Sequence, residues 1–256
     1  MGRCVPTESL RIPAAEGHAL AATLELPDGA PLGTAVFAHC FTCSMDGRAA
    51  SHVSRALARH GIGVLRFDFT GLGASEGDFA DTHFSSNLAD LHAAIGFLRT
   101  QYAAPRLLVG HSLGGAAVLA IAGQVPEVRA VATIGAPADP AHVVHQFEDE
   151  IDEIRADGEA EVRLGGRPFT IRREFLADVA AQDPDARIAA LDAALLVMHS
   201  PVDRVVGIDQ AAAIYARAKH PKSFIALDGA DHLLTGREDA AWAASLIAAW
   251  SARYLD

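Results

Sequence analysis

Short, nearly continuous apolar runs alternate with longer amphipathic segments along most of this chain. The runs are rich in Val, Leu, Ile, Phe and Ala, as expected for parallel strands covered on both faces. The segments between them repeat apolar residues every three or four positions, which is the period of a helix. The alternation therefore predicts an α/β fold with a mostly parallel central sheet and helices on both faces. The predicted strands are residues 34–39, 62–67, 107–109, 128–134, 195–199 and 224–227.

The two ends of the chain depart from this alternation. Near the N-terminus, two extended segments flank residues 16–17 and predict an antiparallel hairpin at the sheet edge. Near the C-terminus, Trp242, Leu246, Trp250 and Tyr254 recur at every fourth position. This spacing predicts a helix that buries all four side chains in one stripe.

A long insertion, residues 140–192, separates the fourth and fifth predicted parallel strands and exceeds a simple crossover. Within residues 148–161, eight acidic residues stand against Arg155 alone, and Gly165-Gly166 then favours the turn of a hairpin. We predict a single domain, residues 1–256, with a small inserted lid made of an acidic helix, a hairpin and a helix. The acidic run fits a solvated helix face, and it also favours neutral over anionic substrates.

Composition and charge limit the partners of the chain. Its 256 residues are 50% hydrophobic and 21% charged, enough to bury a core without disulfides or metals. A formal charge of −11 and the lack of a basic run argue against nucleic acid. The first residues lack the apolar core of a signal peptide, and no apolar run approaches the roughly 18–20 residues of a membrane span. We therefore expect a cytoplasmic protein that binds neither nucleic acid nor membrane.

The strongest chemical motif is the G-x-S-x-G pattern of residues 110–114. It lies directly between a predicted strand and a helical segment, as a nucleophile elbow requires. Gly110 and Gly114 leave room for the tight turn around Ser112. The N–H of Leu113, at the start of the following helix, suits an oxyanion. Because a serine hydroxyl is a weak nucleophile at neutral pH, a base must accompany it.

His232 and Asp203 complete a candidate triad with Ser112. His232 lies in the loop after the last predicted strand, and Asp203 follows the strand before it. The chain order Ser, Asp, His is the one expected when a nucleophile elbow follows a central strand. Asp139, after the strand at residues 128–134, is the competing acid.

With these residues in place, the chain resembles the α/β-hydrolase family over essentially its whole length. FAHC at residues 37–40 occupies the family's His-Gly-x oxyanion position, and FDFTGLGASEG at residues 67–77 matches its next loop. The resemblance implies a serine carboxylesterase or thioesterase that needs no cofactor. It also implies that a second oxyanion N–H comes from Phe41. Since Cys40 replaces the usual glycine, the amide of Cys40 is the alternative.

A narrower resemblance is to the hydrolase half of two-domain proteins in which an α/β-hydrolase is fused to an OsmC-type thiol peroxidase domain. It implies an OsmC-type peroxidase as a candidate partner. The alternative function is then a catalytically silent hydrolase-fold module that docks or regulates that peroxidase, and a homodimer is also open. The matching segments are FAHCFTCS, LRFDFTGLGASEGDFADTHFSSN, GHSLGGAAV, IGAPADPAHV and GGRPFTIRREFL.

Cys40 and Cys43 form a C-x-x-C in the predicted oxyanion loop. Two interpretations stay open: two free thiols that shape the loop, or a redox pair whose bond distorts the oxyanion hole and reversibly lowers activity. His142 and His145 form a weak H-x-x-H, and we expect no metal site there. Aromatic side chains from the lid and from the loop before residue 87 are predicted to line the acyl pocket or to pack the lid. They are Phe79, His83, Phe84, Phe147, Phe169 and Phe175.

Overall fold

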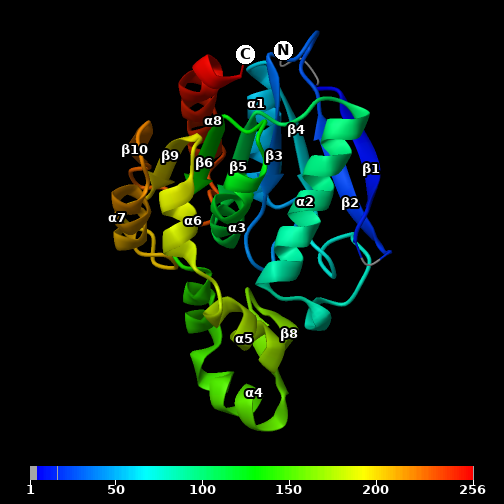
Figure 1. Ribbon diagram of the computed structural model, residues 1–256, viewed down its shortest axis with the longest axis vertical. Helices are drawn as coiled ribbons and strands as arrows, with labels where there is room; N and C mark the ends of the chain where they lie inside the picture. Colours follow the sequence, from blue (N-terminus) through cyan, green and yellow to red (C-terminus); the bar gives the residue numbers. More distant parts are fainter. Residues whose placement is uncertain (1–4, 16, 256) are drawn as a thin grey trace.

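The computed structural model describes residues 5–15 and 17–255, and its centre is one eight-stranded sheet (Figure 1). The strands are β1 (Thr7–Pro13), β2 (Ala19–Glu25), β3 (Gly33–Ala38), β4 (Ile62–Phe67), β5 (Leu107–His111), β6 (Ala130–Ile134), β9 (Ala194–His199) and β10 (Lys222–Ala226). Their spatial order is β1-β2-β4-β3-β5-β6-β9-β10. β1 and β2 pair antiparallel at one edge, β2 is antiparallel to β4, and the remaining neighbours are parallel. The predicted α/β fold and edge hairpin are confirmed, although Glu16 lies outside the described residues.

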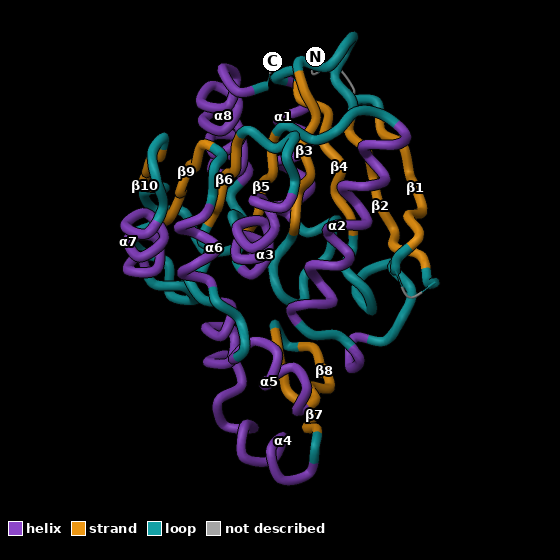
Figure 2. The backbone as a smooth tube through the Cα atoms, viewed as in Figure 1, coloured by secondary structure: helices purple, strands orange, loops and turns teal. Residues whose placement is uncertain are grey.

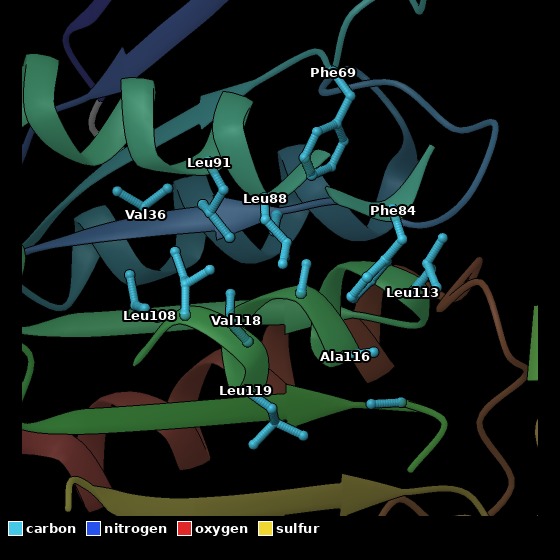
Figure 3. Packing of buried hydrophobic residues seen from close by; sticks show 14 of the residues in the cluster. Val36, Phe69, Phe84, Leu88, Leu91, Leu108, Leu113, Ala116, Val118 and Leu119 are labelled. Atoms are coloured by element: carbon cyan, nitrogen blue, oxygen red, sulfur yellow. The ribbon is translucent and has the colours of Figure 1, made fainter. Parts of the chain in front are cut away.

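Helices cover both faces of this sheet. Alternate strand residues point to opposite faces, so that Val36 and Leu108 join one core and Phe37 and Val109 the other. The first core lies under α2, α3, α6 and α7, and Figure 3 shows Leu88 and Leu91 of α2 facing Val118 of α3 across it. The second core lies under α1 and α8. The helices are α1 (Arg48–Arg59), α2 (Phe84–Gln101), α3 (Leu113–Ile121), α6 (Pro184–Ala190), α7 (Ile208–Arg217) and α8 (Arg237–Ser251), with short 3-10 turns η1 (Phe79–Asp81), η2 (Ala122–Gln124) and η4 (Ala252–Tyr254).

Helix α8 buries small residues, so the predicted buried stripe is wrong. Trp242 is 41% exposed, and Leu246, Trp250 and Tyr254 are only half-buried at the margin of the core. A spacing of four residues turns by about 40° per step relative to a helix face, so it leaves the buried side. Small side chains at a mixed spacing of three and four instead let α8 lie close to α1. The buried residues of α8 are Ala240, Ala243, Ala244, Ile247, Ala248 and Ser251.

The elements of the insertion that we call the lid lie beyond the carboxyl ends of the parallel strands, at the bottom of Figures 1 and 2. Gly165 and Gly166, both with positive φ, turn the two-stranded sheet formed by β7 and β8, so the predicted hairpin is confirmed. The acidic segment contains the predicted short helix, α4. The predicted helix after the hairpin is present as α5. A second helix near the end of the insertion, α6, packs against α3 in the helical layer of the sheet. The lid elements are η3 (Pro140–Glu150), α4 (Ile151–Asp157), β7 (Glu159–Leu164), β8 (Arg167–Arg172) and α5 (Arg173–Ala180).

Within the described part of the chain, no helix combines the length and apolar character needed to cross a bilayer.

Candidate active site

Ser112 occupies the tight turn that joins β5 to α3. Its φ of +54° lies in the left-handed region that residues with a side chain rarely adopt, so the turn holds local backbone strain. Two hydrogen bonds keep it there: the Ser112 N–H donates to the Ile134 carbonyl at 2.9 Å, and the Gly115 N–H donates to the Ser112 carbonyl at 2.8 Å. The hydroxyl is thereby placed at the amino end of α3, above the carboxyl edge of the sheet.

The glycines of the motif are required by close backbone approaches. A Cβ added to Gly114 would lie 2.6 Å from the carbonyl carbon of Ala38 and closer still to the oxygens of Ala38 and His39. A Cβ added to Gly110 would lie 2.6 Å from the Cα of Gly115. The first turn of α3 therefore packs directly against β5 and the end of β3, with no space for a side chain.

The three predicted triad residues meet at the carboxyl edge of the sheet. Ser112 Oγ lies 3.1 Å from Nε2 of His232, and His232 Nδ1 lies 2.7 Å from Oδ2 of Asp203. With Nδ1–H donating to the carboxylate, Nε2 is left to accept the serine proton. The side chains of Asp203 and His232 are 1% and 8% exposed, so these hydrogen bonds are shielded from water.

The carboxylate of Asp203 is held in its charged form. Burial alone would raise its pKa, but hydrogen bonds from His232 and from the N–H groups of Val206 and Val205 outweigh burial and lower the pKa below its ordinary value. These N–H groups donate to Oδ1 at 3.0 and 2.8 Å. Asp139, the competing acid, instead accepts the N–H of Ala141 at 2.8 Å and caps η3.

His111, next to Ser112, holds the loop that carries His232. Its Nε2–H donates to the carbonyl oxygen of His232 at 2.7 Å, and the two ring centroids are 5.2 Å apart. Burial first, and then the neighbouring His232, lowers the pKa of His111 to about 3. The imidazole therefore stays neutral at physiological pH and keeps donating one hydrogen bond to the loop.

Two further buried histidines fasten the loops around the triad. His39 Nδ1–H donates to the Cys40 carbonyl at 2.8 Å, and burial lowers the pKa of His39 in spite of this hydrogen bond. His199 Nε2–H donates to the Val206 carbonyl at 2.8 Å, in the loop that contains Asp203. Each imidazole thus orders a backbone segment that carries a candidate site residue.

The loop after β3 is closed by a disulfide between Cys40 and Cys43, whose Cα atoms are 5.3 Å apart. The interpretation as two free thiols is therefore wrong. The triad is hydrogen-bonded in the same structure, so the bond does not disrupt it. Among the described residues no acceptor pairs with the N–H of Phe41, inside the loop, and the Leu113 N–H has no intrahelical partner.

Phenylalanines of the lid pack onto the loop after β3, which contains Phe41. Ring centroids are 5.4 Å apart for Phe41 and Phe175, 5.6 Å for Phe41 and Phe79, 4.8 Å for Phe79 and Phe169, and 6.2 Å for Phe147 and Phe175. This phenylalanine cluster joins the lid to the loop that contains Phe41.

The space next to this cluster is small. Phe84 of α2 lies beside Leu113 at the start of α3 (Figure 3). These two residues, with Phe41 and Leu72, line a cavity of about 10 Å³, which holds about one water molecule. His83, in contrast, caps α2 by accepting the Ser86 N–H at 3.1 Å, and no ring contact joins it to the phenylalanine cluster within the described residues.

Two residues near the site were not anticipated from the sequence. Arg167 of the hairpin donates to the carbonyl of Thr42, and its guanidinium lies 5.1 Å from the Phe169 ring centroid, so it fastens the lid to the disulfide loop. Gly135 has φ +57°, and an added Cβ would lie 3.3 Å from Asp203 Oδ2. The sequence signal for Gly135 is its place directly after β6, whereas the contact of Arg167 has no local signal.

No cluster of three or more His, Cys, Asp or Glu side chains suited to a metal ion occurs within residues 5–15 and 17–255. His142 and His145 meet edge to face with 4.9 Å between ring centroids, and His142 Nε2 lies 3.2 Å from the Val205 carbonyl. Their contacts connect η3 to the loop that carries Asp203.

Comparison with known proteins supports a hydrolase. The model of the family described as serine aminopeptidase, S33, matches residues 29–156. The crystal structure of the esterase domain of a Rhodothermus marinus protein is 49% identical, covers 98% of this chain and 100% of that one, and has a TM-score of 0.82. A monoacylglycerol lipase of Mycolicibacterium smegmatis is 26% identical over 71% of this chain and 74% of its own length. The rat mitochondrial palmitoyl-protein thioesterase ABHD10 is 30% identical over 44% of this chain and 36% of its own length.

Proposed function

The chain belongs to the serine aminopeptidase S33 family of hydrolases, and we propose that it cleaves carboxylic or thio esters of short-to-medium acyl chains through an acyl-enzyme. The observation that carries the proposal is the hydrogen-bonded series Ser112, His232 and Asp203. In this proposal residues 1–256 act as one hydrolase domain, and the insertion at residues 140–192 supplies the lid.

The triad performs acyl transfer in two halves. His232 Nε2 takes the proton of Ser112 as Oγ attacks the acyl carbonyl, and it returns that proton to the leaving alcohol or thiol. A water molecule then repeats the sequence on the acyl-enzyme. Asp203 keeps the proton of His232 on Nδ1 and stabilises the imidazolium that forms. Its lowered pKa supports this role, because the carboxylate stays charged throughout the reaction.

Two backbone amides are the proposed oxyanion donors. The N–H groups of Leu113 and Phe41 are free of acceptors within the described residues, and both border the small cavity beside α3. The Cys40 carbonyl accepts hydrogen bonds from His39 and from the Cys43 N–H, and it belongs to the same planar peptide unit as the Phe41 N–H. These hydrogen bonds fix the direction of the Phe41 N–H, which favours Phe41 over Cys40 as the donor. Loss of one such donor costs about 3 kcal/mol of transition-state stabilisation.

The acyl group is proposed to enter beside the phenylalanine cluster. The five phenylalanines there offer an apolar surface, and the acidic segment at residues 148–161 disfavours an anionic acyl chain. Because the cavity beside Leu113 has room for only about one water molecule, an acyl chain requires the lid to move outward. Esterase and thioesterase relatives both support an acyl substrate. Oxygen esters and sulfur esters of the same acyl group are therefore both assayed in the test below.

Labelling with a fluorophosphonate tests the nucleophile. Intact-mass analysis and peptide mapping of the wild type should show one adduct on Ser112, and Ser112→Ala should show none. The same substitution should lower kcat on the order of 10⁶-fold for matched oxygen and sulfur esters. Absence of an adduct from folded wild type would refute the proposal and favour the silent module that docks an OsmC-type peroxidase. That partner, a homodimer and a cytoplasmic location stay predictions.

A further inference from the structure

A cluster of basic side chains lies on the outer face of α1 and the start of α8, in a chain whose formal charge is −11. Arg48, His52, Arg55 and Arg59 follow one another along α1 at steps of four, three and four residues, so they share one face of this helix. Arg237 joins them from the first turn of α8, which packs against α1. We call these five residues the basic groove.

The charges of the basic groove are largely uncompensated. Within the described part of the chain, Arg48, Arg59 and Arg237 make no ion pair, while Arg55 lies 3.4 Å from the buried carboxylate of Glu25. Nδ1 of His52 is buried and has no hydrogen-bond partner. Burial, and then the charges of Arg237, Arg55 and Arg48, lower the pKa of His52, as expected beside a concentration of positive charge.

The acidic residues nearest in sequence do not line this groove. Glu238 and Asp239 follow Arg237 in the first turn of α8. The carboxylate of Asp239 folds back over Gly236 at the amino end of that helix. A cavity of about 230 Å³ at the groove is lined by His52, Arg55, Ala56, Arg59, Arg237 and Ala241, without a carboxylate.

A second cavity, of about 260 Å³, is lined by sequence neighbours of two triad residues and by the start of α1. Its wall includes His111, which precedes Ser112, and Leu233, which follows His232. It also includes both disulfide cysteines and the first residues of α1. Arg48 of this cavity lies one helical turn before His52 of the other, and Thr235 lies two residues before Arg237. The two cavities therefore follow one another along the junction of α1 and α8.

The chemistry of the triad indicates which part of the substrate this second cavity would take. In the tetrahedral intermediate the oxyanion points to the amides of Phe41 and Leu113, and the acyl chain points to the phenylalanine cluster. The leaving atom must stay within reach of His232 Nε2, which protonates it. The cavity bounded by the disulfide loop is lined by the sequence neighbours of Ser112 and His232, namely His111 and Leu233, and α1 extends about 16 Å away from it, from Arg48 to Arg59.

We propose that this junction binds the leaving group of the substrate, and that the leaving group is an alcohol or thiol on an extended arm that ends in a phosphate. This inference rests on the proposed function. Guanidinium groups pair with phosphate oxygens through two parallel hydrogen bonds, and several of them stand here without carboxylate partners. The substrate is thus neutral at its acyl end, under the acidic lid, and anionic at its leaving end, in the basic groove.

Matched substrates test the phosphate. The sulfur pair is butyryl-coenzyme A with S-butyryl-N-acetylcysteamine, and the oxygen pair is 1-butyrylglycerol 3-phosphate with 1-butyrylglycerol. Within each pair the acyl group is the same and only one member carries phosphate. For wild type at low salt we expect kcat/KM to favour the phosphorylated member at least tenfold in one of the pairs, which identifies the arm. Absence of a preference in both pairs would overturn the inference.

Variants locate the preference. Arg59→Glu combined with Arg237→Glu should raise KM for the phosphorylated substrate at least tenfold, leave its kcat unchanged and leave the phosphate-free substrate unaffected. The control, Arg129→Glu, changes an exposed arginine next to β6 and should keep the preference. Equal thermal melting would show that all variants are folded. A preference that survives the double substitution would overturn the inference.

Failure of the proposed hydrolase function can be distinguished from failure of the phosphate site. If Ser112 takes no fluorophosphonate and no ester is cleaved, binding of coenzyme A to wild type by calorimetry tests the groove alone. Binding that Arg59→Glu with Arg237→Glu abolishes would support the phosphate site. Absent or unaltered binding would overturn it.

Discussion

Gly114→Ala tests whether the contact between α3 and β3 positions the nucleophile. The added Cβ would lie 2.6 Å from the Ala38 carbonyl carbon, whereas ordinary contact begins at 3.4 Å. The neighbours are backbone atoms that cannot rotate away, so the first turn of α3 must shift by roughly 1 Å. A displacement of this size at reacting groups costs about 10²-fold in rate, which corresponds to about 2.7 kcal/mol. The Leu113 N–H moves with the same turn.

The expected result has two parts. In steady-state assays with a phosphate-free butyryl ester, kcat should fall about 10²-fold, and urea titration should show a loss of about 1–3 kcal/mol in the free energy of unfolding. Gly96→Ala is the matched control, because an added Cβ in the middle of α2 meets no atom within 4 Å. It should keep kcat and stabilise the protein by about 0.5–1 kcal/mol. A Gly114→Ala enzyme with wild-type kcat and stability would refute the close-packing argument.

Three further predictions concern the groups around the triad. Asp203→Asn should lower kcat by about 10⁴-fold, because the amide cannot hold the tautomer of His232 in which Nδ1 carries the proton. Pre-steady-state kinetics should show slowed acylation. An unchanged acylation rate would mean that another acid orients His232. The folded pKa of His111, about 3, lies below its ordinary value near 6.5, so the unfolded chain binds more protons between these values. The free energy of unfolding therefore rises as the pH rises across that window. His111→Gln should make this slope shallower by up to about 1.4 kcal/mol per pH unit in urea titrations from pH 4.5 to 7.5, and an unaltered slope would contradict the burial argument. Dithiothreitol should lower kcat severalfold and diamide should restore it, because the disulfide closes the loop that presents the Phe41 N–H. Cys43→Ala should show low activity that neither reagent changes. A loss of activity on oxidation would instead support the hypothesis that the Cys40–Cys43 bond distorts the oxyanion hole.

Local spacing in the sequence was sufficient for the fold and for the tight turn that carries Ser112. Apolar runs separated by helical periods predicted the parallel strands, because a strand covered on both faces must be apolar throughout. Gly110 and Gly114 around Ser112 predicted a tight strand-to-helix turn, because only residues without a side chain permit the close backbone contacts now seen there. The Gly165-Gly166 turn was also predictable, because glycine readily adopts the positive φ that both residues have in the structure.

Tertiary structure decided what depends on contacts between distant segments. Asp203 and Asp139 both follow strands, and only the fold shows that Asp203 reaches His232 while Asp139 caps η3. The spacing of Trp242 to Tyr254 fitted a buried stripe, yet close packing of α8 on α1 selected alanines.

The basic groove has the same origin. Its arginines are scattered through an acidic chain and become neighbours only where α1 meets α8. Sequence therefore specifies features that arise within one helix, strand or turn, where backbone geometry relates spacing directly to direction. Packing partners, ion pairing and the choice among similar residues require the three-dimensional arrangement, because their energies depend on distances that spacing along the chain does not set.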